Sequence, residues 1–311
     1  MTQIAVPHFI KPQLATLVKS APKGTNWLHE IKFDGYRLLS FIEKDCVRLV
    51  SRSDQDWTRK FQILVNGILK LNLEQAILDG ELVVLDDKGI SRFQLLQNSL
   101  QFNQHANFRY YVFDILFYNH QDLRSLALIE RKKILAKVLK PSSNGIVQLS
   151  HFVVGRGSRI YEESCKLGLE GIIAKRCNSC YQSSRNENWL KIKCIKQQEF
   201  VVGGYTDPQG SRFGLGALLV GYYENSKLHY CGKVGTGFNQ QSLEMLLEKL
   251  RPLQRTNSPF DNLSNTKATN WVKPKLVVEV VFTEWTQDRR LRHPSFQGLR
   301  EDKKAKEVHY E

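Results

Sequence analysis

The sequence predicts an α+β protein built from two domains, because its pattern changes once along the chain. Between residues 27 and 195, segments with strand patterning alternate with segments whose apolar residues have helical spacing. After Cys194, Gly203-Gly204, Asp207-Pro208 and Gly210 separate short strands with one helix among them. Roughly five short strands and a helix in about 110 residues fit a small closed barrel such as an OB-fold. We expect the domains to span residues 1–196 and 197–311.

The first domain is expected to start with a short helix at residues 14–18 and a meander of strands at 27–33, 36–43 and 47–51. Thr58 fits the N-cap of a helix over 58–71, and Ser91 fits that of a helix reaching Gln101. A strand at 76–85 is expected to be interrupted at 79–81. The other expected elements are strands at 110–117, 171–174 and 189–195 and helices at 128–139 and 157–167, then, in the second domain, strands at 199–205, 216–224, 227–231 and 277–285 and a helix at 242–250.

The charge of the chain indicates a polyanionic partner. Lys plus Arg total 45 against 31 Asp plus Glu, which gives a formal charge of +14. Lysine and arginine bound to phosphates release condensed counterions, so such an excess favours nucleic acid. An anionic membrane would also suit it, but the sequence has no amphipathic basic helix, no long apolar run and no apolar segment of signal-peptide type.

The six cysteines are expected to be reduced and mostly buried, as in a cytoplasmic protein. Cys177 and Cys180 form a C-x-x-C pair, and no second pair of this kind follows. A zinc site or a redox pair is the alternative, but a single C-x-x-C is weak evidence for either.

The stretch from Glu30 to Arg37 carries the most informative pattern of the chain. Lys32 has carboxylates two residues before and two after it, and spacing of two places side chains on one face of a strand. Asp34-Gly35 is a turn signal, which would let Arg37 reach the same pocket. Lysine has a pKa of about 10.4, so an attacking amine must be desolvated or lie near other cations. The alternative is an exposed, ion-paired strand.

This stretch resembles motif I of the nucleotidyltransferase superfamily that contains ATP-dependent DNA ligases, RNA ligases and mRNA capping enzymes. The resemblance implies a nucleotidyltransferase (adenylation) domain of antiparallel sheets with flanking helices, followed by an all-β OB-fold domain. It implies that Lys32 becomes covalently nucleotidylated, with Asp34 and Arg37 as further catalytic residues. It also implies that Glu30, Ile31 and Arg37 contact the nucleotide.

Two further segments resemble motifs of the same superfamily. Arg52 ends the third expected strand and resembles an arginine that binds nucleic-acid phosphate, although Ser53-Asp54 follow it where the family commonly has Asn-Gly. Without the resemblance, Arg52 is an ordinary surface arginine. Glu81 of the segment 79–81 resembles a glutamate near the ribose or a catalytic metal, whereas Asp-Gly alone is only a turn.

The segments 111–114 and 170–175 resemble motifs III and IV. The resemblance implies that Phe113 stacks on adenine, which offers a π-face, while Asp114 is held by hydrogen bonds in a buried strand. Glu170 would bind a divalent cation, which prefers oxygen ligands, and Gly171 fits a close backbone approach. On their own, these segments are a core strand and a turn.

The segment 189–193 resembles motif V, and strand alternation puts Lys191 and Lys193 on one face. Two ammonium groups facing the α-phosphate would stabilise charge and disfavour protonation of Lys32. The alternative is an edge strand protected by lysines. Upstream, Tyr181 and Ser184-Arg185-Asn186 depart from the family's Y-x-x-G-R-S, which affects a loop.

The segment 298–303 resembles motif VI, in which Arg300 and Lys303 orient the departing pyrophosphate. Trp271-Val272-Lys273-Pro274 also matches the ligase pattern, and the alternative is a basic, solvated tail. The resemblance therefore covers residues 23–306, and it is strongest to the ligase domain of bacterial ligase D-type end-joining proteins. At 311 residues, we expect the sequence to hold no polymerase or nuclease domain of the kind often fused there. A stand-alone minimal ligase and an excised domain both remain open.

The resemblance implies an ATP-dependent DNA ligase that uses ATP, Mg²⁺ or Mn²⁺ and a lysyl-AMP intermediate. The expected substrate is nicked or broken double-stranded DNA with a 5′-phosphate and a 3′-hydroxyl, in DNA repair within the cytoplasm of a bacterium, at the nucleoid. We expect a monomer, no membrane contact and an end-joining protein as candidate partner. The alternatives are an RNA ligase or capping-type nucleotidyltransferase and a non-catalytic OB-fold nucleic-acid-binding protein.

Overall fold

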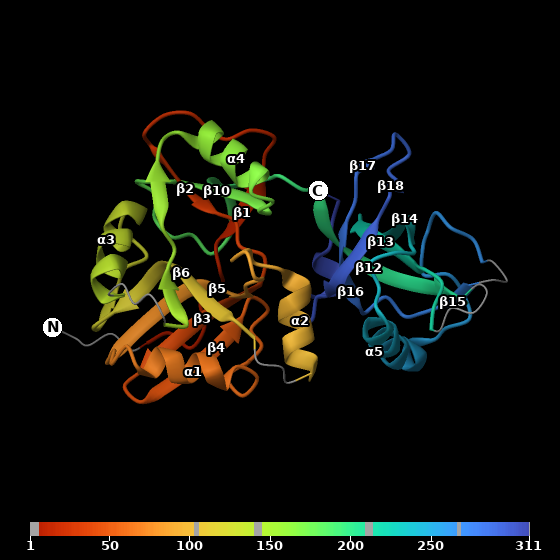
Figure 1. Ribbon diagram of the computed structural model, residues 1–311, viewed down its shortest axis with the longest axis horizontal. Coiled ribbons are helices and arrows are strands. Elements are labelled where there is room, and N and C mark those ends of the chain that lie inside the picture. The colour runs from red at the N-terminus through yellow and green to blue at the C-terminus, as the bar shows by residue number, and fades with distance from the viewer. Residues whose placement is uncertain (1–5, 103–105, 140–144, 209–213, 266–268, 311) are drawn as a thin grey trace. The chain divides into compact units, whose positions relative to one another are not determined.

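The computed structural model describes residues 6–102, 106–139, 145–208, 214–265 and 269–310 (Figure 1). Its internal contacts divide the chain into two compact units, Met1–Cys194 and Ile195–Glu311. Each unit has a hydrophobic core of its own. Within the described residues, no helix is long and apolar enough to cross a membrane.

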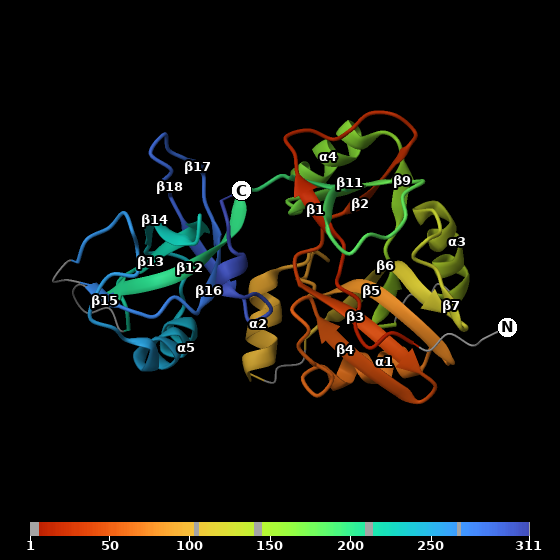
Figure 2. The same cartoon turned by 180° about the vertical axis from the view of Figure 1, so that it is seen from behind.

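The first unit contains two main β-sheets (Figure 1 and Figure 2). One sheet has the order β1-β11-β10-β2-β9, and the other has the order β4-β3-β5-β6-β7 with β8 paired to β6. Neighbouring strands are antiparallel except for the parallel pairs β1–β11 and β6–β8. The strands are β1 Leu14–Leu17, β2 Trp27–Ile31, β3 Tyr36–Glu43, β4 Cys46–Ser51, β5 Gln75–Val84, β6 Phe108–Tyr118, β7 Gln121–Asp122, β8 Val147–Leu149, β9 Phe152–Val154, β10 Gly171–Arg176 and β11 Arg185–Lys193.

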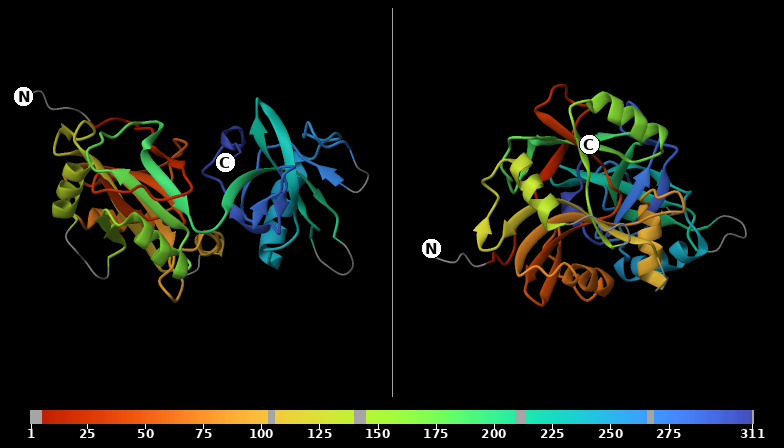
Figure 3. Two further views of the ribbon diagram at one scale, coloured as in Figure 1. Left: turned by 90° about the horizontal axis from the view of Figure 1, so that it is seen from above. Right: turned by 60° about the vertical axis from the view of Figure 1, so that its left-hand side comes forward.

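Three apolar clusters hold these sheets and their helices together. The largest packs one face of the β3–β6 sheet against α1, and the α2 residues Phe93 and Leu96 belong to the same cluster. A second cluster joins the other face of that sheet to the β10–β11 sheet through Phe113 and Trp189. A third packs the outer face of the β10–β11 sheet against α4, while α3 packs against β6 at the edge of the unit (Figure 3). The helices are α1 Gln62–Leu69, α2 Phe93–Phe102, α3 Leu128–Val138 and α4 Gly157–Lys166.

The second unit is an antiparallel sheet of order β14-β13-β12-β16-β19, with β15 paired to β12. A bridge between Thr236 and Ser295 links the segment after β14 to β19, which joins the two ends of the sheet as a closed barrel requires. Asn239 and Ser242 form a reciprocal capping box at the start of α5. The elements are β12 Gln197–Thr206, β13 Leu218–Glu224, β14 Lys227–Val234, α5 Gln240–Leu250, β15 Thr269–Trp271, β16 Val277–Val281, β17 Glu284–Trp285, β18 Leu291–Arg292 and β19 Ser295–Leu299, with 3₁₀ turns at Arg251–Leu253 and Ala305–Glu307.

Two predictions about the start of the chain are wrong. Residues 14–17 form the edge strand β1, not a helix, because they pair in parallel with β11. The predicted three-stranded meander is also wrong, since β2 pairs with β10 and β9 while β3 pairs with β4 and β5. The chain changes sheet at Gly35, where a Cβ atom would lie 2.2 Å from the carbonyl oxygen of Leu82.

Other local predictions are also corrected. Thr58 does not cap α1: the helix starts at Gln62, and the Thr58 hydroxyl accepts a hydrogen bond from the Leu49 amide at 3.0 Å. The strand β5 is not interrupted at Asp79-Gly80 but continues through it with a bulge in its pairing to β6. The Ser91 hydroxyl accepts from the Asp34 amide at 3.1 Å, two residues before α2 begins.

The prediction that all six cysteines are reduced is wrong, because Cys165 and Cys194 form a disulfide. It joins α4 to the residue that follows β11, two segments that already pack together through the third cluster. The prediction of mostly buried thiols is wrong as well: Cys46 and Cys180 are exposed and Cys177 is half-buried, whereas Cys231 is buried. The thiols of Cys177 and Cys180 donate to different carbonyl groups, those of Thr25 and Ser125.

The disulfide predicts a thiol count and a change in stability. Unfolded, unreduced protein should titrate four thiols, since four of the six cysteines are free. Because the bridge spans 29 residues, its loss through Cys165→Ser should lower the free energy of unfolding by about 3.5 kcal/mol. Thermal unfolding without reductant tests this, with Cys46→Ser as the control at an exposed thiol. A count of six thiols would contradict the bridge.

Candidate active site

The inner face of the β10–β11 sheet carries a set of mostly charged side chains in adjacent rows. Residues opposite each other in antiparallel strands share a face of the sheet. One row contains Glu30, Ile173 and Lys191, and the next contains Lys175 and Trp189. Their neighbours Leu190 and Ile192 are buried on the opposite face. The predicted alternation of the segment 189–193 is therefore confirmed.

Lys32 lies one residue beyond β2, at the end of this face. Its amide donates to the carbonyl of Gly171 at 2.9 Å, which extends the pairing of β2 with β10. Its ammonium donates to Oε2 of Glu170 at 2.6 Å, although the two residues are 138 positions apart. Gly171 has φ 153°, and a Cβ atom there would lie 2.1 Å from the Ile192 carbonyl oxygen. The glycine is thus required for the close approach that brings Lys32 to Glu170.

Lys32 carries a positive charge in this arrangement. Burial opposes that charge, but the carboxylates of Glu170, Asp34 and Glu81 outweigh burial and raise the pKa of Lys32. The expectation that neighbouring cations would favour the neutral amine is therefore wrong. The Lys32 side chain is 22% exposed and that of Glu170 is 6% exposed, so the ammonium remains partly accessible.

Asp34 and Arg37 are both held by protein groups. Oδ2 of Asp34 accepts from the Phe93 amide at 3.2 Å, so Asp34 satisfies a donor at the start of α2. The Arg37 guanidinium binds both oxygens of Asp79, at 2.9 and 2.6 Å, and donates to the Gln13 carbonyl at 2.6 Å. Arg37 therefore lies as a fixed cation on the β3–β5 sheet.

Glu81 lies on β5 directly opposite Arg37. It is close enough to Lys32 to contribute to the raised pKa of that lysine, as Glu170 does. Within the described ranges, no group of three or more His, Cys, Asp or Glu residues gathers as a ready metal site. Two carboxylates fit a divalent cation that takes its other ligands from water and substrate phosphates, which is the usual mode for Mg²⁺.

Phe113 lies between the two sheets and is 8% exposed. The ammonium of Lys175 lies 4.1 Å from the centroid of its ring, and Arg37 lies 5.1 Å from the same centroid. The predicted platform for adenine is thus in contact with cations of the protein. On the same strand, Tyr111 is half-buried and stacks on Phe33 with the centroids 4.0 Å apart.

Glu30 is buried, and both of its carboxylate oxygens accept hydrogen bonds. Oε1 accepts from Lys132 and Oε2 accepts from Lys175 at 2.7 Å. Ile31 is 39% exposed and pairs with Ile172, on the face of the sheet opposite Glu30. The sequence analysis did not identify Lys132, Lys175 or Ile173 as site residues. Ile173 is half-buried and apolar, and it lies between Glu30 and Lys191. The alternation of the strand 171–176 was the sequence signal for Ile173 and Lys175, and it does not extend to Lys132 on α3.

Arg52 lies in the turn that follows β4. Asp54, two residues later, has φ 61°, a left-handed conformation that favours Gly, Asn or Asp. The Ser51 hydroxyl accepts from the Gln55 amide at 3.2 Å and holds the turn. The acidic residue therefore has a local conformational role in the turn.

Arg300 and Lys303 belong to the second unit and pair with its carboxylates. Arg300 binds Asp302 through two hydrogen bonds, at 2.8 and 2.7 Å, and Glu279 at 2.9 Å. Lys303 pairs with Glu199. These contacts fix both cations beside Glu199 and Glu279, which lie opposite each other on β12 and β16.

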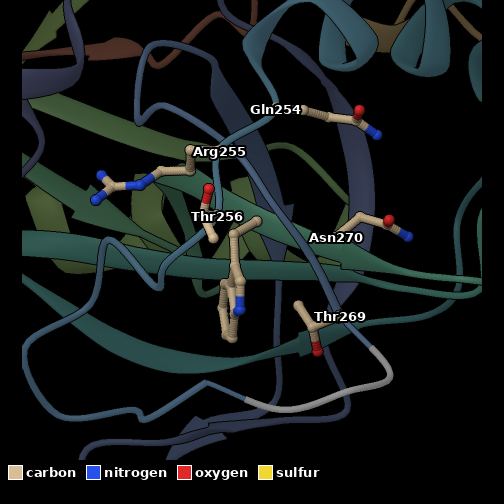
Figure 4. Close-up of a pocket in the computed structure, with 6 residues that line it drawn as sticks. Gln254, Arg255, Thr256, Thr269 and Asn270 are labelled. Atoms are coloured by element: carbon tan, nitrogen blue, oxygen red, sulfur yellow. The ribbon is translucent and has the colours of Figure 1, made fainter.

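A separate pocket of about 400 Å³ lies in the second unit (Figure 4). It is open and polar, and the sequence predicts no site residue in it. Its lining residues are Gln254, Arg255, Thr256, Thr269, Asn270 and Trp271.

Two family models match the two units. The model described as ATP dependent DNA ligase domain matches residues 12–193, and the model described as ATP dependent DNA ligase C terminal region matches residues 211–303. The first alone covers more than half of the chain. The chain belongs to the ATP-dependent DNA ligase family.

Individual relatives agree with this assignment. The multifunctional non-homologous end joining protein LigD of Pseudomonas aeruginosa is 42% identical over 309 residues, which cover 97% of this chain and 37% of the relative. The corresponding DNA repair protein LigD of Mycobacterium tuberculosis (strain H37Rv) is 38% identical over 305 residues, 96% of this chain and 39% of the relative. The chain thus spans less than half the length of these relatives.

A solved structure supports the fold. The mycobacterial DNA ligase D complexed with ATP and MES matches with a TM-score of 0.71 and 35% identity, over 97% of this chain and 98% of that one. The predicted fold class, a nucleotidyltransferase domain followed by an OB-fold domain, is confirmed.

Proposed function

We propose that this chain seals 5′-phosphate/3′-hydroxyl breaks in double-stranded DNA, using ATP and a lysyl-AMP intermediate on Lys32. The observation that carries the proposal is the contact between Lys32 and Glu170, at 2.6 Å, beside the row that contains Lys191. The relatives named as end-joining proteins support a role in DNA repair. We assign residues 1–196 to the nucleotidyltransferase domain and residues 197–311 to the OB-fold domain.

The reaction starts with loss of a proton from the Lys32 ammonium. The carboxylate of Glu170 is in hydrogen-bond contact with that ammonium and can accept the proton. The amine then forms a bond to the α-phosphorus of ATP, the bond to the β-phosphate oxygen breaks, and pyrophosphate leaves. Lys191 and Lys193 stabilise the charge on the α-phosphate, and Arg300 and Lys303 orient the pyrophosphate.

The nucleotide is held by residues of both sheets. Ile173 offers an apolar side chain and Ile31 its backbone groups, Glu30 and Phe113 contact the base, and Arg37 supplies a fixed positive charge. A divalent cation, Mg²⁺ or Mn²⁺, would be held by Glu81 and Glu170 together with phosphate oxygens. When bound, the cation withdraws charge from the phosphates of ATP. Asp34 keeps the turn after Lys32 in place.

The second half of the reaction concerns DNA. AMP passes from Lys32 to the 5′-phosphate of the break, and the 3′-hydroxyl then displaces AMP and closes the strand. The charge of +14 supports contact with DNA phosphates, and we assign one such contact to Arg52. We further propose a monomer that works on nicked or broken DNA at the bacterial nucleoid, in the cytoplasm, with an end-joining protein as partner.

Intact mass after incubation with ATP or GTP and a divalent metal tests this function. We expect a gain of one AMP from ATP and none from GTP. A gain of GMP would favour a capping-type enzyme, and sealing of RNA in preference to DNA would favour an RNA ligase. If neither nucleotide adds mass to protein first cleared of AMP with pyrophosphate, the chain is a non-catalytic binding protein.

A further inference from the structure

Three charged side chains are buried together beneath the proposed nucleotide pocket. Glu30, Lys132 and Lys175, here called the buried triad, have side chains that are at most 2% exposed. They come from three elements, β2, α3 and β10. One carboxylate faces two ammonium groups, so the triad keeps a net positive charge inside the protein. Burying charge is costly even when the charge is paired, so stability alone is a poor reason for this arrangement.

The two lysines of the triad differ in what else they contact. The ammonium of Lys175 lies 4.1 Å from the ring centroid of Phe113 and 4.1 Å from that of Trp189. The ammonium of Lys132 lies 5.4 Å from the ring of Phe152 instead. A desolvated cation over an aromatic face is attracted by the negative face of the ring. Lys175 alone therefore links the carboxylate of Glu30 to the ring of Phe113.

We propose that Lys175 is a positioning residue of the nucleotide pocket, which holds the Glu30 carboxylate and the Phe113 ring in fixed relation and so sets the affinity and selectivity for the purine. The inference rests on the proposed use of ATP. It adds a residue and a role to that function: Lys175 acts through Glu30 and Phe113.

The chemistry of the base explains why the position of Glu30 matters. A carboxylate only accepts hydrogen bonds, and each of its oxygens has two lone pairs. With one lone pair on each oxygen occupied by a lysine, the remaining ones can accept from an exocyclic amine such as that of adenine. Guanine has a carbonyl oxygen at the corresponding position, which a carboxylate repels. Loosening Glu30 should therefore weaken both affinity and discrimination.

Lys175 also changes charge near neutral pH. Burial lowers its pKa, Glu30 raises it and Lys132 lowers it, and the result is a pKa of about 8. Two further charged groups lie nearby. Asp114 raises the pKa of Lys175, and Arg37 contacts the ring of Phe113, which Lys175 also contacts. Because the ammonium form makes the contacts to Glu30 and to the rings, the pocket should loosen as the pH rises above about 8.

The test is the dissociation constant of α,β-methylene-ATP, an analogue whose α–β bridge cannot be cleaved, measured between pH 6.5 and 9.5. For the unmodified protein we expect the constant to rise above pH 8. Lys175→Met should raise the constant about tenfold at pH 7, reduce the preference for adenine over guanine analogues, and remove the pH dependence. Lys175→Arg keeps the cation at every pH, so it should bind as the unmodified protein does at pH 7 and should not weaken at pH 9.

Lys132→Met is the matched control, because it removes the other lysine of the triad and leaves Lys175 with Glu30. It should weaken binding at pH 7 by less than Lys175→Met does, because Glu30 loses one lysine contact while Phe113 keeps its contact with Lys175. It should also shift the rise of the dissociation constant to higher pH, because the charge of Lys132 lowers the pKa of Lys175. A structural role alone would not produce such a shift. The proposal is overturned if both Met variants change the constant equally, or if they change only the melting temperature.

The analogue separates this inference from the proposed function. If the protein binds it as described but no AMP reaches Lys32 from ATP, the inference stands and the ligase mechanism fails. If AMP reaches Lys32 while Lys175→Met and Lys175→Arg bind the analogue like the unmodified protein at every pH, the mechanism stands and the inference fails. If the protein binds no analogue at all, both fail.

Discussion

Lys32→Arg should abolish AMP transfer while leaving the fold intact. Arginine keeps a positive charge that can pair with Glu170, but its guanidinium stays protonated and does not attack phosphorus. We expect a loss of about 10⁴-fold or more, since no other group can replace a covalent nucleophile. The measurement is labelling of the protein with α-labelled ATP, followed by peptide mapping.

The control for this variant is Lys133→Arg. Lys133 lies on α3, is largely exposed and pairs with the neighbouring carboxylate of Glu130. Its replacement should leave labelling and thermal unfolding unchanged. A labelled Lys32→Arg protein would show that another residue is the nucleophile.

Glu170→Gln should reduce AMP transfer by about 10²- to 10³-fold, a loss typical of removing a group that stabilises charge in the transition state. The variant sets two effects against each other. Glu170 raises the pKa of Lys32, so glutamine should lower that pKa and favour the neutral amine. Glutamine also removes the carboxylate that accepts the proton and would bind the metal. Our mechanism requires the second effect to dominate.

Single-turnover adenylation from pH 6 to pH 9 distinguishes the two effects. A Glu170→Gln protein that adenylates faster than the unmodified one at neutral pH would mean that Glu170 only restrains Lys32. Glu163→Gln is the matched control, because Glu163 lies on the exposed face of α4 and pairs with Lys166. It should leave the rate unchanged.

Sequence patterns identified residues that the structure brings together, but not the strand pairings that bring them together. Lys32 and Glu170 were identified 138 residues apart, and the structure joins them through the pairing of β2 with β10. The alternation of Lys191 and Lys193 could also be read, because a strand with one buried face fixes its own pattern. These predictions depend on local periodicity and on motif order, both of which are visible in one chain.

Predictions that depended on knowing which strand pairs with which were wrong. The segment 14–17 has no pattern long enough to separate a helix from a strand, and its pairing with β11 decides the matter. Likewise, the three strands after Trp27 look like one meander because nothing local shows that the chain changes sheet at Gly35. A strand's partner is a non-local property, so sequence spacing does not reveal it.

The charge states of Lys32 and Lys175 also depend on neighbours that the local sequence does not reveal. Sequence reasoning placed the neutral amine at Lys32, whereas the structure raises the pKa of Lys32 and lowers that of Lys175 to about 8. The difference arises from which carboxylates face each lysine. Glu170, Asp34 and Glu81 act on Lys32, and a second cation, Lys132, acts on Lys175. These neighbours come from distant segments of the chain.

The central claim is that AMP on Lys32 is the intermediate that seals DNA. Purified protein carrying one AMP should therefore be mixed with an excess of nicked DNA and metal, without ATP, and followed by intact mass and by strand length. We expect one strand sealed for each AMP lost from the protein, and no sealing by Lys32→Arg. AMP that remains on the protein, or leaves it without a sealed strand, would contradict the account.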